Sequence, residues 1–395
     1  MRILLHDYGQ FPFSVELARS LARRGHELLY AYNKADSARA HLAFSEEERR
    51  RLEVVGVEVS QPLLKQSFYK RRQHEVAEGH AAAKEIDRFR PDVVISANTP
   101  LDAQSILLKR TRERGAKFVY WVQDLIGIAT DKILRKRLPI VGAVVGHHYV
   151  RMEQSLIRQS DQAVLITEAF RPILHDWGVR PERVHVVENW SPLDQLPMRP
   201  RDNEWAARHG LQDKLCVVYA GTMGMKHNPE LILELARSLT DKDDVRVVVV
   251  SEGSGVDWLR QQQEKQPLRN LVMLPFQPFE VMPDVLATAD VLVAVLEPSA
   301  GVFSVPSKVL TYLCGGRPLL LAVPLENLAA RIVEENRAGL VVAPSDIAGF
   351  TAAAGRLLAD ESLRRELARG ARHYAETHFD IDAITDKFET VLAAK

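Results

Sequence analysis

The chain has 395 residues, more than one ordinary hydrophobic core accommodates, so we expect two domains. Hydrophobic residues make up 46% and charged residues 26%, a profile typical of soluble globular proteins. The 52 basic and 52 acidic residues cancel, which argues against nucleic acid as a partner. No stretch approaches ~18 consecutive apolar residues, so we expect no transmembrane helix, and the N-terminal apolar stretch is too short for a signal peptide. Cys216 and Cys314 lie in separate apolar runs and are interpreted as core residues in a reducing compartment.

The first half of the chain alternates short apolar runs with helical patterns, which indicates a parallel α/β domain. Segment 36–90 is highly charged and is predicted to be mostly helical. The loop after the first apolar run carries the glycine Gly9 without the G-x-G-x-x-G set of dinucleotide-binding proteins. Strands are expected at 2–6, 27–32, 93–96, 117–122, 162–166 and 184–189.

Polar residues follow two of these strands. Asn98 and Thr99 come after the strand at 93–96, and Gln123 and Asp124 come after the strand at 117–122. An acid at the carboxyl end of a strand is well placed to meet a ligand of an open parallel sheet. Asp124 is therefore a candidate functional residue, and the alternative is a helix N-cap or a surface loop residue.

Residues 132–151 differ in composition from the neighbouring segments. A basic cluster of Lys132, Arg135, Lys136 and Arg137 is followed by an apolar patch at 138–145. One interpretation is an interfacial segment that binds anionic lipid. The other is a buried helix with a polar lead-in.

A proline-rich, irregular stretch at 190–207 is interpreted as a linker, and a second α/β domain begins at Lys214. Its first strand feeds a loop with Gly221 and Gly224, and a later strand feeds a loop with Gly253. The predicted division is 1–195 for the N-terminal domain, 196–380 for the C-terminal domain and 381–395 for a helix that crosses back to the first domain.

The segment 292–320 is predicted to run as strand, loop, helix and strand. The helix begins near Ser307 and Lys308, which add a hydroxyl donor and a cation to the unpaired N–H groups at the helix start. Loops between strand and helix are where open parallel sheets bind ligands. This pattern predicts a phosphate or diphosphate pocket, and the alternative is a solvated helix cap followed by a surface lysine.

In order and spacing, these elements resemble the retaining glycosyltransferases of the GT-B fold, group 1 class, family four. The resemblance spans most of the chain and is carried by YAGTMG with Lys226, SEGSG, LPFQP, ATADVLVAVLEP, VPSKVLTYLCGGRP and VVENWSPLD. The branch that it resembles builds bacterial surface polysaccharides and includes fucosaminyl-type transferases. It implies an α/β fold of two Rossmann-like domains facing a central cleft, with the acceptor on the N-terminal side and the nucleotide sugar on the C-terminal side.

The sequence also departs from the family pattern. The two glutamates of that pattern correspond here to Thr311 and Phe303, and Glu297 is acidic but out of register. Thr222 stands where the family commonly has an arginine. The diphosphate and ribose contacts of the family pattern are therefore not all available here.

The resemblance implies that a nucleotide diphosphate sugar, with UDP as the expected nucleotide, donates its sugar with retention and without a metal or other cofactor. The acceptor is expected to be a glycan or a polyprenyl-linked glycan of a bacterial surface polysaccharide such as lipopolysaccharide. Lys226 and Lys308 are expected to stabilise the leaving diphosphate, and Asp124 to orient the acceptor hydroxyl or take its proton, with Asn98 and His6 as neighbours. The remaining donor contacts are expected from Gly9, Gly221, Thr222, Gly224, Gly253, Phe276, Gln277, Ser304, Ser307 and Thr311.

Two other functions fit the same fold: a GT-B sugar-nucleotide epimerase and a non-catalytic sugar-nucleotide binding protein. We expect a cytoplasmic protein, with peripheral attachment to the inner membrane face through 132–145 as a hypothesis.

Overall fold

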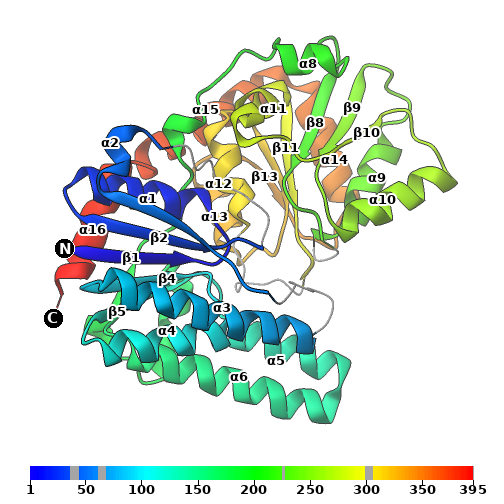
Figure 1. Cartoon of the computed structure of the whole chain (residues 1–395). Coiled ribbons are helices and arrows are strands. Elements are labelled where there is room, and N and C mark those ends of the chain that lie inside the picture. The colour runs from blue at the N-terminus through cyan, green and yellow to red at the C-terminus, as the bar shows by residue number, and fades with distance from the viewer. Residues whose placement is uncertain (36–43, 61–67, 225–226, 299–305, 395) are drawn as a thin grey trace. The chain divides into compact units, whose positions relative to one another are not determined.

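The computed structural model describes residues 1–35, 44–60, 68–224, 227–298 and 306–394. They form two compact units, Met1–Asn189 together with Ile381–Lys395, and Trp190–Asp380 (Figure 1). The predicted domain boundary follows residue 195, whereas the units divide between Asn189 and Trp190. Both units are α/β, and each is built around a parallel sheet.

The first unit contains a seven-stranded sheet in the order β3-β2-β1-β4-β5-β6-β7. Its strands are β1 Arg2–Asp7, β2 Glu27–Asn33, β3 Leu52–Val57, β4 Val93–Ala97, β5 Lys117–Val122, β6 Gln162–Leu165 and β7 Val184–Val186. Its helices are α1 Pro12–Arg23, α2 Glu46–Arg49, α3 Phe68–Phe89, α4 Leu101–Glu113, α5 Ile126–Arg137, α6 Pro139–Gln159, α7 Arg171–Asp176 and α16 Ile381–Ala393.

Helices cover both faces of this sheet, with α3, α4, α5 and α6 on one side and α1 and α16 on the other (Figure 1). Parallel strands that are covered on both faces have mostly apolar sequences, and β1, β4 and β5 follow this pattern. Phe388 of α16 packs against Trp121 with ring centroids 4.8 Å apart, and Arg24 donates a hydrogen bond to Glu389 at 2.8 Å. These contacts attach the C-terminal helix to the first unit.

The expectation that 36–90 is mostly helical is wrong for Leu52–Val57, which forms strand β3 at the edge of the sheet. Only the two end residues of β3 are buried, because an edge strand is covered on fewer sides than a central one. Its apolar run is consequently short and is interrupted by Glu53 and Gly56. The arginine- and glutamate-rich sequence around it favoured the helical interpretation.

The second unit contains a six-stranded sheet in the order β10-β9-β8-β11-β12-β13. Its strands are β8 Leu215–Ala220, β9 Val245–Val250, β10 Leu271–Leu274, β11 Val291–Val295, β12 Leu319–Ala322 and β13 Gly339–Val342. Its helices are α8 Glu204–Arg208, α9 Pro229–Ser238, α10 Ser254–Lys265, α11 Met282–Thr288, α12 Ser307–Cys314, α13 Leu328–Glu335, α14 Ile347–Ala359 and α15 Glu361–His378.

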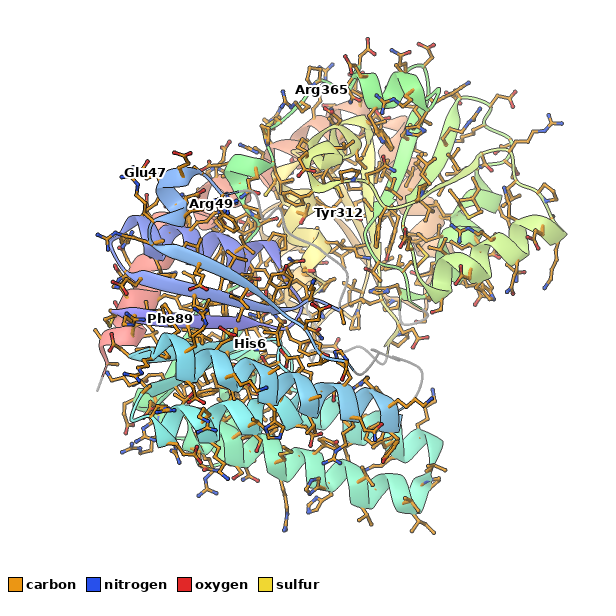
Figure 2. All side chains as sticks on the ribbon, viewed as in Figure 1. His6, Glu47, Arg49, Phe89, Tyr312 and Arg365 are labelled. Atoms are coloured by element: carbon orange, nitrogen blue, oxygen red, sulfur yellow. The ribbon has the colours of Figure 1, made fainter. Side chains whose placement is uncertain are left out.

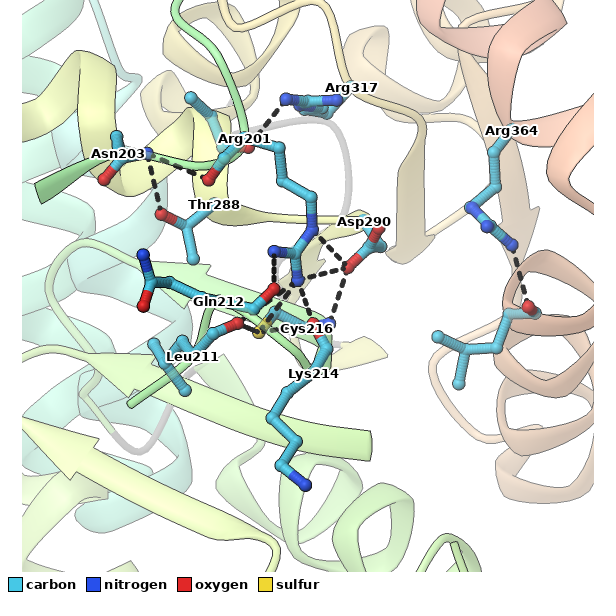
Figure 3. A network of polar contacts seen from close by, with 12 residues as sticks. Arg201, Asn203, Leu211, Gln212, Lys214, Cys216, Thr288, Asp290, Arg317 and Arg364 are labelled. Carbon is cyan, nitrogen blue, oxygen red and sulfur yellow. Dashed lines mark hydrogen bonds and ion pairs between the residues drawn. The ribbon is translucent and has the colours of Figure 1, made fainter. Parts of the chain in front are cut away.

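A half-buried arginine joins the amino ends of two strands in this unit (Figure 3). Arg201 donates to the carbonyl of Gln212 at 2.7 Å and to the Asp290 carboxylate at 3.3 Å. Asp290 in turn accepts the backbone N–H of Cys216 at 2.8 Å. Burial raises the pKa of the Cys216 thiol to about 11, which keeps it protonated and inert. Cys216 and Cys314 are both buried, in agreement with their prediction as core residues.

The strand order of each sheet reverses once. In the first unit the chain extends from β1 toward β3 and then restarts at β4, and in the second it extends from β8 toward β10 and restarts at β11. Open parallel sheets bind ligands beyond the carboxyl ends of the strands at such a reversal. The loops after β1 and β4, and those after β8 and β11, are therefore the positions where this fold is expected to bind ligands.

Candidate functional site

The first unit has a cavity of about 210 Å³ at the carboxyl ends of β1, β4 and β5. Three residues predicted from the sequence to form the site, Gly9, Asn98 and Asp124, line it together. Its walls combine aromatic rings with small polar groups. The lining residues are Tyr8, Gly9, Phe11, Asn98, Thr99, Tyr120, Trp121, Gln123, Asp124 and Ile126.

The loop that carries Gly9 is organised by Asp7, which the sequence analysis did not single out. The Asp7 carboxylate accepts the Phe11 N–H at 2.6 Å, the Gly9 N–H at 3.2 Å and the Asn98 amide at 2.9 Å. Burial raises the pKa of Asp7, and the hydrogen bond from Ser14 opposes that shift. An acid at the carboxyl end of a fully buried first strand was the available sequence signal.

Gln123 and Asp124, the two polar residues that follow β5, differ in hydrogen bonding and in exposure. The side-chain amides of Gln123 and Asn189 exchange two hydrogen bonds, at 3.1 Å and 2.6 Å. Asp124 is exposed and lines the cavity. His6, expected as a neighbour of Asp124, is fully buried and is not among the lining residues, because its ring lies between Thr99 and Glu78.

A buried acid lies behind the Asp124 loop. Glu153 of α6 accepts the N–H of Gly127 at 3.0 Å, at the start of α5. Its Oε1 is buried without a hydrogen-bond partner among the described residues. Burial raises the pKa of Glu153 to about 8, despite the opposing effect of the α5 backbone N–H groups. Glu153 therefore fixes the position of the helix that begins at the cavity wall.

In the second unit, Lys308 belongs to α12, and its side chain contacts the glycine loop after β8. Its Nζ donates to the Thr222 carbonyl at 3.1 Å and to the Tyr219 hydroxyl, and it lies 3.9 Å from the centre of the Tyr219 ring. Gly221 has φ +126°, a conformation suited to glycine, and a Cβ there would lie 3.4 Å from Lys308 Cε. The structure thus brings together Gly221, Thr222 and Lys308, which the sequence placed in separate motifs.

Tyr312 holds α12 in the orientation that presents Lys308. The two residues are four apart and share a helix face. The buried Tyr312 hydroxyl accepts the Ala220 N–H and donates to the Ala220 carbonyl, both at 2.7 Å, at the end of β8 (Figure 2). The lysine therefore reaches the loop from a helix anchored directly to the strand that feeds it.

The loop after β9 packs closely on the loop after β8. Gly253 has φ +122°, and a Cβ there would lie 2.7 Å from the Met223 carbonyl oxygen, so only glycine fits. The N–H of Gly224, one of the predicted donor contacts, donates to Nδ1 of His227 at 2.9 Å. This hydrogen bond helps to shape the loop.

The other predicted donor contacts are spread along the same carboxyl edge. Phe276 is 38% exposed after β10, and the adjacent Gln277 accepts a hydrogen bond from Trp205 at 3.1 Å. Ser307 is the exposed first residue of α12, and the Thr311 hydroxyl lies 3.1 Å from that of Ser191. Lys226, Ser304 and Phe303 lie outside the described residues.

The α5–α6 hairpin ends in an exposed apolar surface, here called the hairpin tip. It consists of Ile133, Leu138, Ile140, Val141 and Val144, which are between 55% and 83% exposed. The alternative of a buried helix is wrong for these residues. Lys132, Arg135 and Lys136 are exposed beside them, and Arg135 pairs with Asp131 at 2.7 Å.

The hairpin is tightly packed. A Cβ at Gly142 would lie 2.1 Å from the Leu134 carbonyl, and one at Gly146 would lie 2.3 Å from Asp131. None of the described helices has the length and apolarity that a membrane span requires. The described residues also contain no group of three metal-ligating side chains placed to hold a metal ion.

Two α/β domains, each with a Rossmann-like parallel sheet, are the defining feature of the GT-B fold. The glycosyl transferase 4-like domain matches residues 9–190, and the glycosyl transferases group 1 domain matches residues 214–360. The two matches together account for most of the chain, which belongs to the group 1 glycosyltransferases.

Several known proteins resemble this chain in sequence or in fold. The chain is 24% identical over 307 residues to the putative colanic acid biosynthesis glycosyl transferase WcaI of Escherichia coli, a match that covers 76% of this chain and 74% of the relative. The structure of HepE from Anabaena in complex with UDP-glucose superimposes with a TM-score of 0.73, at 15% identity over the full length of both chains. The lipopolysaccharide glycosyltransferase WaaG superimposes with a TM-score of 0.71, at 16% identity over the full length of both chains.

Proposed function

We propose that this glycosyltransferase moves a sugar from a UDP-sugar, with retention, to a glycan or lipid-linked glycan during the synthesis of a bacterial surface polysaccharide. The part of the proposal that concerns the donor rests on Lys308, whose ammonium group contacts the glycine loop at the end of β8. When the bond between the sugar and the diphosphate breaks, negative charge builds up on the departing oxygen. A fixed cation there stabilises the transition state more than the ground state.

The cavity of the first unit supports an acceptor sugar. Its volume of about 210 Å³ and its aromatic walls suit one sugar ring, which presents apolar C–H faces and hydroxyl edges. Asp124 is exposed to this cavity and offers carboxylate oxygens to an acceptor hydroxyl. As the new C–O bond forms, that hydroxyl gives its proton either to Asp124 or to the departing phosphate oxygen.

The names of similar proteins support the finer parts of the proposal. The E. coli relative is described as acting in colanic acid biosynthesis, and WaaG in lipopolysaccharide biosynthesis. Structures of HepE contain UDP-glucose, and UDP together with glucose. HepE thus supports a UDP-sugar as the donor, and the E. coli relative and WaaG support a surface polysaccharide as the acceptor.

The exposed hairpin tip supports a lipid-linked acceptor. Apolar side chains that are more than half exposed beside lysine and arginine are typical of segments that rest in the headgroup region of an anionic membrane. The tip belongs to the same unit as the cavity assigned to the acceptor. Attachment through the tip would hold that unit at a membrane containing the acceptor.

The proposal is tested by incubating the protein with UDP-, GDP-, dTDP- and ADP-sugars, with and without lipid-linked glycans from bacterial membranes. We expect UDP release that increases when acceptor is added, with the anomeric configuration of the sugar retained. Interconversion of donor sugars without UDP release would identify an epimerase. Nucleotide-sugar binding without any turnover would identify a binding protein.

A further inference from the structure

One aromatic ring of the first-unit cavity is more open to a ligand than the others. Phe11 lines the cavity and is half-buried, whereas the other aromatic lining residues are at most 8% exposed. Both polar groups of the Phe11 backbone are engaged inside the protein. Its N–H donates to Asp7 at 2.6 Å, and its carbonyl accepts the N–H of Ser14 at 3.2 Å. The part of Phe11 that faces the cavity is therefore its side chain.

Backbone and packing restrict the orientation of the Phe11 ring. Phe11 precedes Pro12, a position that favours extended backbone, and its φ of −80° and ψ of 144° agree with this preference. Phe13 stacks on Phe11 with ring centroids 5.4 Å apart and 22° between the ring planes. Phe11 stays half-buried in spite of this contact, so part of its ring surface remains open to the cavity.

A series of ring contacts connects Phe11 to the C-terminal helix. Phe13 of α1 makes an edge contact with Trp121 of β5 at 5.4 Å, and Trp121 makes another with Phe388 of α16 at 4.8 Å. These three residues are at most 3% exposed, and close packing in a protein interior makes the position of each ring depend on its neighbours. Helices α1 and α16 cover the same face of the sheet (Figure 1). Helix α16 thus supports the ring that faces the cavity.

An open aromatic face is suited to the C–H groups of a sugar. The face of an aromatic ring carries partial negative charge, and C–H hydrogens carry partial positive charge. A pyranose presents several C–H groups on a ring face that has no axial oxygen. The exposed Asp124 carboxylate lines the same cavity and accepts hydrogen bonds from hydroxyls. Phe11 and Asp124 therefore match the two kinds of surface that a sugar has.

We propose that Phe11 is a specificity-determining residue on which one C–H face of the bound sugar stacks, and that Phe388 of α16 is its positioning residue, acting through the rings between them. The cavity then disfavours a sugar with an axial oxygen on the stacked face. This inference rests on the proposed use of the cavity by the glycosyl acceptor, and it adds which surface of that acceptor is recognised.

The test uses the full chain and three methyl glycosides as probes. Methyl β-D-glucopyranoside has no axial oxygen on either ring face, methyl α-D-glucopyranoside has one on one face, and methyl β-D-galactopyranoside has one on the other. Saturation-transfer NMR should show the strongest transfer to the axial hydrogens of one face of the first probe. The probe with an axial oxygen on that same face should bind the wild type roughly two- to tenfold more weakly than the first.

Substitutions at Phe11 separate the flat ring from its apolar character. The quantity compared is the ratio of the two dissociation constants, that of the probe with the blocked face over that of methyl β-D-glucopyranoside. Phe11→Leu keeps an apolar side chain and removes the aromatic face, so the ratio should approach one. Phe11→Tyr keeps the aromatic face and should keep the wild-type ratio.

The positioning role is tested with matched buried phenylalanines. Phe388 and Phe118 are both 0% exposed, but Phe118 is three residues from Trp121 on β5 and so faces the other side of the sheet. Phe388→Leu should reduce the ratio, whereas Phe118→Leu should lower the thermal midpoint without changing it. Adding Phe388→Leu to Phe11→Leu should leave the ratio as it is in Phe11→Leu alone, because the ring through which Phe388 acts is absent.

A wild-type ratio of one, an unchanged ratio in Phe11→Leu, or equal ratios in Phe388→Leu and Phe118→Leu would overturn the inference. So would a failure of all three probes to bind the wild type. If UDP release still increases with acceptor in that case, the proposed function stands without this sugar contact. A protein that shows the expected ratios but releases no UDP from any donor would retain the sugar site and lose the proposed transferase function.

Discussion

Lys308 has two roles that a substitution can separate. Its hydrogen bond to Thr222 holds the loop after β8, and in the proposed mechanism its charge stabilises the departing diphosphate more strongly in the transition state than in the ground state. Lys308→Met keeps the aliphatic stem and removes the charge. We expect kcat/KM for the donor to fall by ~10²-fold. The free energy of unfolding should fall by about 2 kcal/mol, because the hydrogen bonds to Thr222 and Tyr219 are both lost and each is typically worth about 1 kcal/mol net.

Lys214 provides the matched control for this prediction. Its Nζ also donates to a backbone carbonyl, that of Asp243 at 3.2 Å, but it lies just before β8, at the opposite end of the strand from Gly221. Lys214→Met should keep the wild-type kcat/KM. The test compares kcat/KM for the donor, from steady-state kinetics, and the free energy of unfolding in urea between the two variants and the wild type. Full activity in Lys308→Met would remove this residue from the donor site.

At the scale of single residues, motifs predicted where the chain turns but not which side chains meet. Gly221 and Gly253 could be placed in loops because glycine follows an apolar run, and both have a positive φ in the structure. The partners of Lys308 were not predictable, since Thr222 and Lys308 are joined only by the packing of α12 on β8. Asp7, Glu78 and Glu153 were missed for the same reason, because their partners are distant in the sequence or depend on helix packing.

At the scale of secondary-structure elements, the α5–α6 hairpin contains a built-in pH dependence. Burial raises the pKa of Glu153 to about 8, whereas an exposed glutamate titrates near 4.3. Between these values the unfolded chain has lost its proton and the folded chain still holds it. Folding therefore takes up a proton, and the stability contributed by this group falls as pH rises through the window and levels off above about pH 8.

Glu153→Gln removes the titration and keeps an oxygen for the Gly127 N–H. The variant should match the wild type near pH 5 and exceed its free energy of unfolding by a few kcal/mol near pH 8.5, since each pKa unit corresponds to about 1.4 kcal/mol. Urea unfolding at several pH values measures the difference. Glu113→Gln on α4 changes a glutamate that pairs with Arg110 at the surface, and should keep the wild-type slope. Identical slopes in wild type and Glu153→Gln would show that Glu153 ionises normally.

The central strands were predicted well, whereas the edge strand β3 was not. Strands β1, β4, β5 and β8 are buried along almost their whole length, and such strands appear in the sequence as continuous apolar runs. Strand β3 is half-exposed at the sheet edge, so its sequence resembles the charged helices on either side. The sequence contains the apolar patch at 138–145, but only the hairpin packing shows that its side chains face outward.

At the scale of the whole molecule, the chain passes from the first unit to the second and returns through α16, so both termini belong to the first unit (Figure 1). The cavity assigned to the acceptor and the hairpin tip belong to this unit too, and α5 connects them. Ile126 at the start of α5 lines the cavity, and Ile133 near its end belongs to the tip. A helix of twelve residues is ~18 Å long. If the tip contacts the membrane as proposed, a lipid-linked acceptor would extend roughly the length of this helix from the membrane surface to reach the cavity.

We expect the protein to bind anionic vesicles through the hairpin tip. Each basic residue beside an anionic leaflet contributes roughly 1 kcal/mol, and the pairing of Arg135 with Asp131 makes its share smaller. Co-sedimentation should therefore be strong with vesicles of phosphatidylcholine and phosphatidylglycerol, weaker with phosphatidylcholine alone, and reduced by salt. Replacing Lys132, Arg135, Lys136 and Arg137 with glutamine should reduce binding to the mixed vesicles.

Two leucine variants separate the tip from general surface apolarity. Leu138 in the tip is 57% exposed, and Leu325 in the second unit is 54% exposed. Both changes to serine remove a similar area of exposed apolar surface, but only Leu138→Ser removes it beside the basic cluster. Leu138→Ser should weaken vesicle binding, and Leu325→Ser should leave it at the wild-type level, with neither change altering UDP release in the absence of membrane. Equal binding by the two variants, or equal binding to neutral and anionic vesicles, would show that the tip is not the membrane contact.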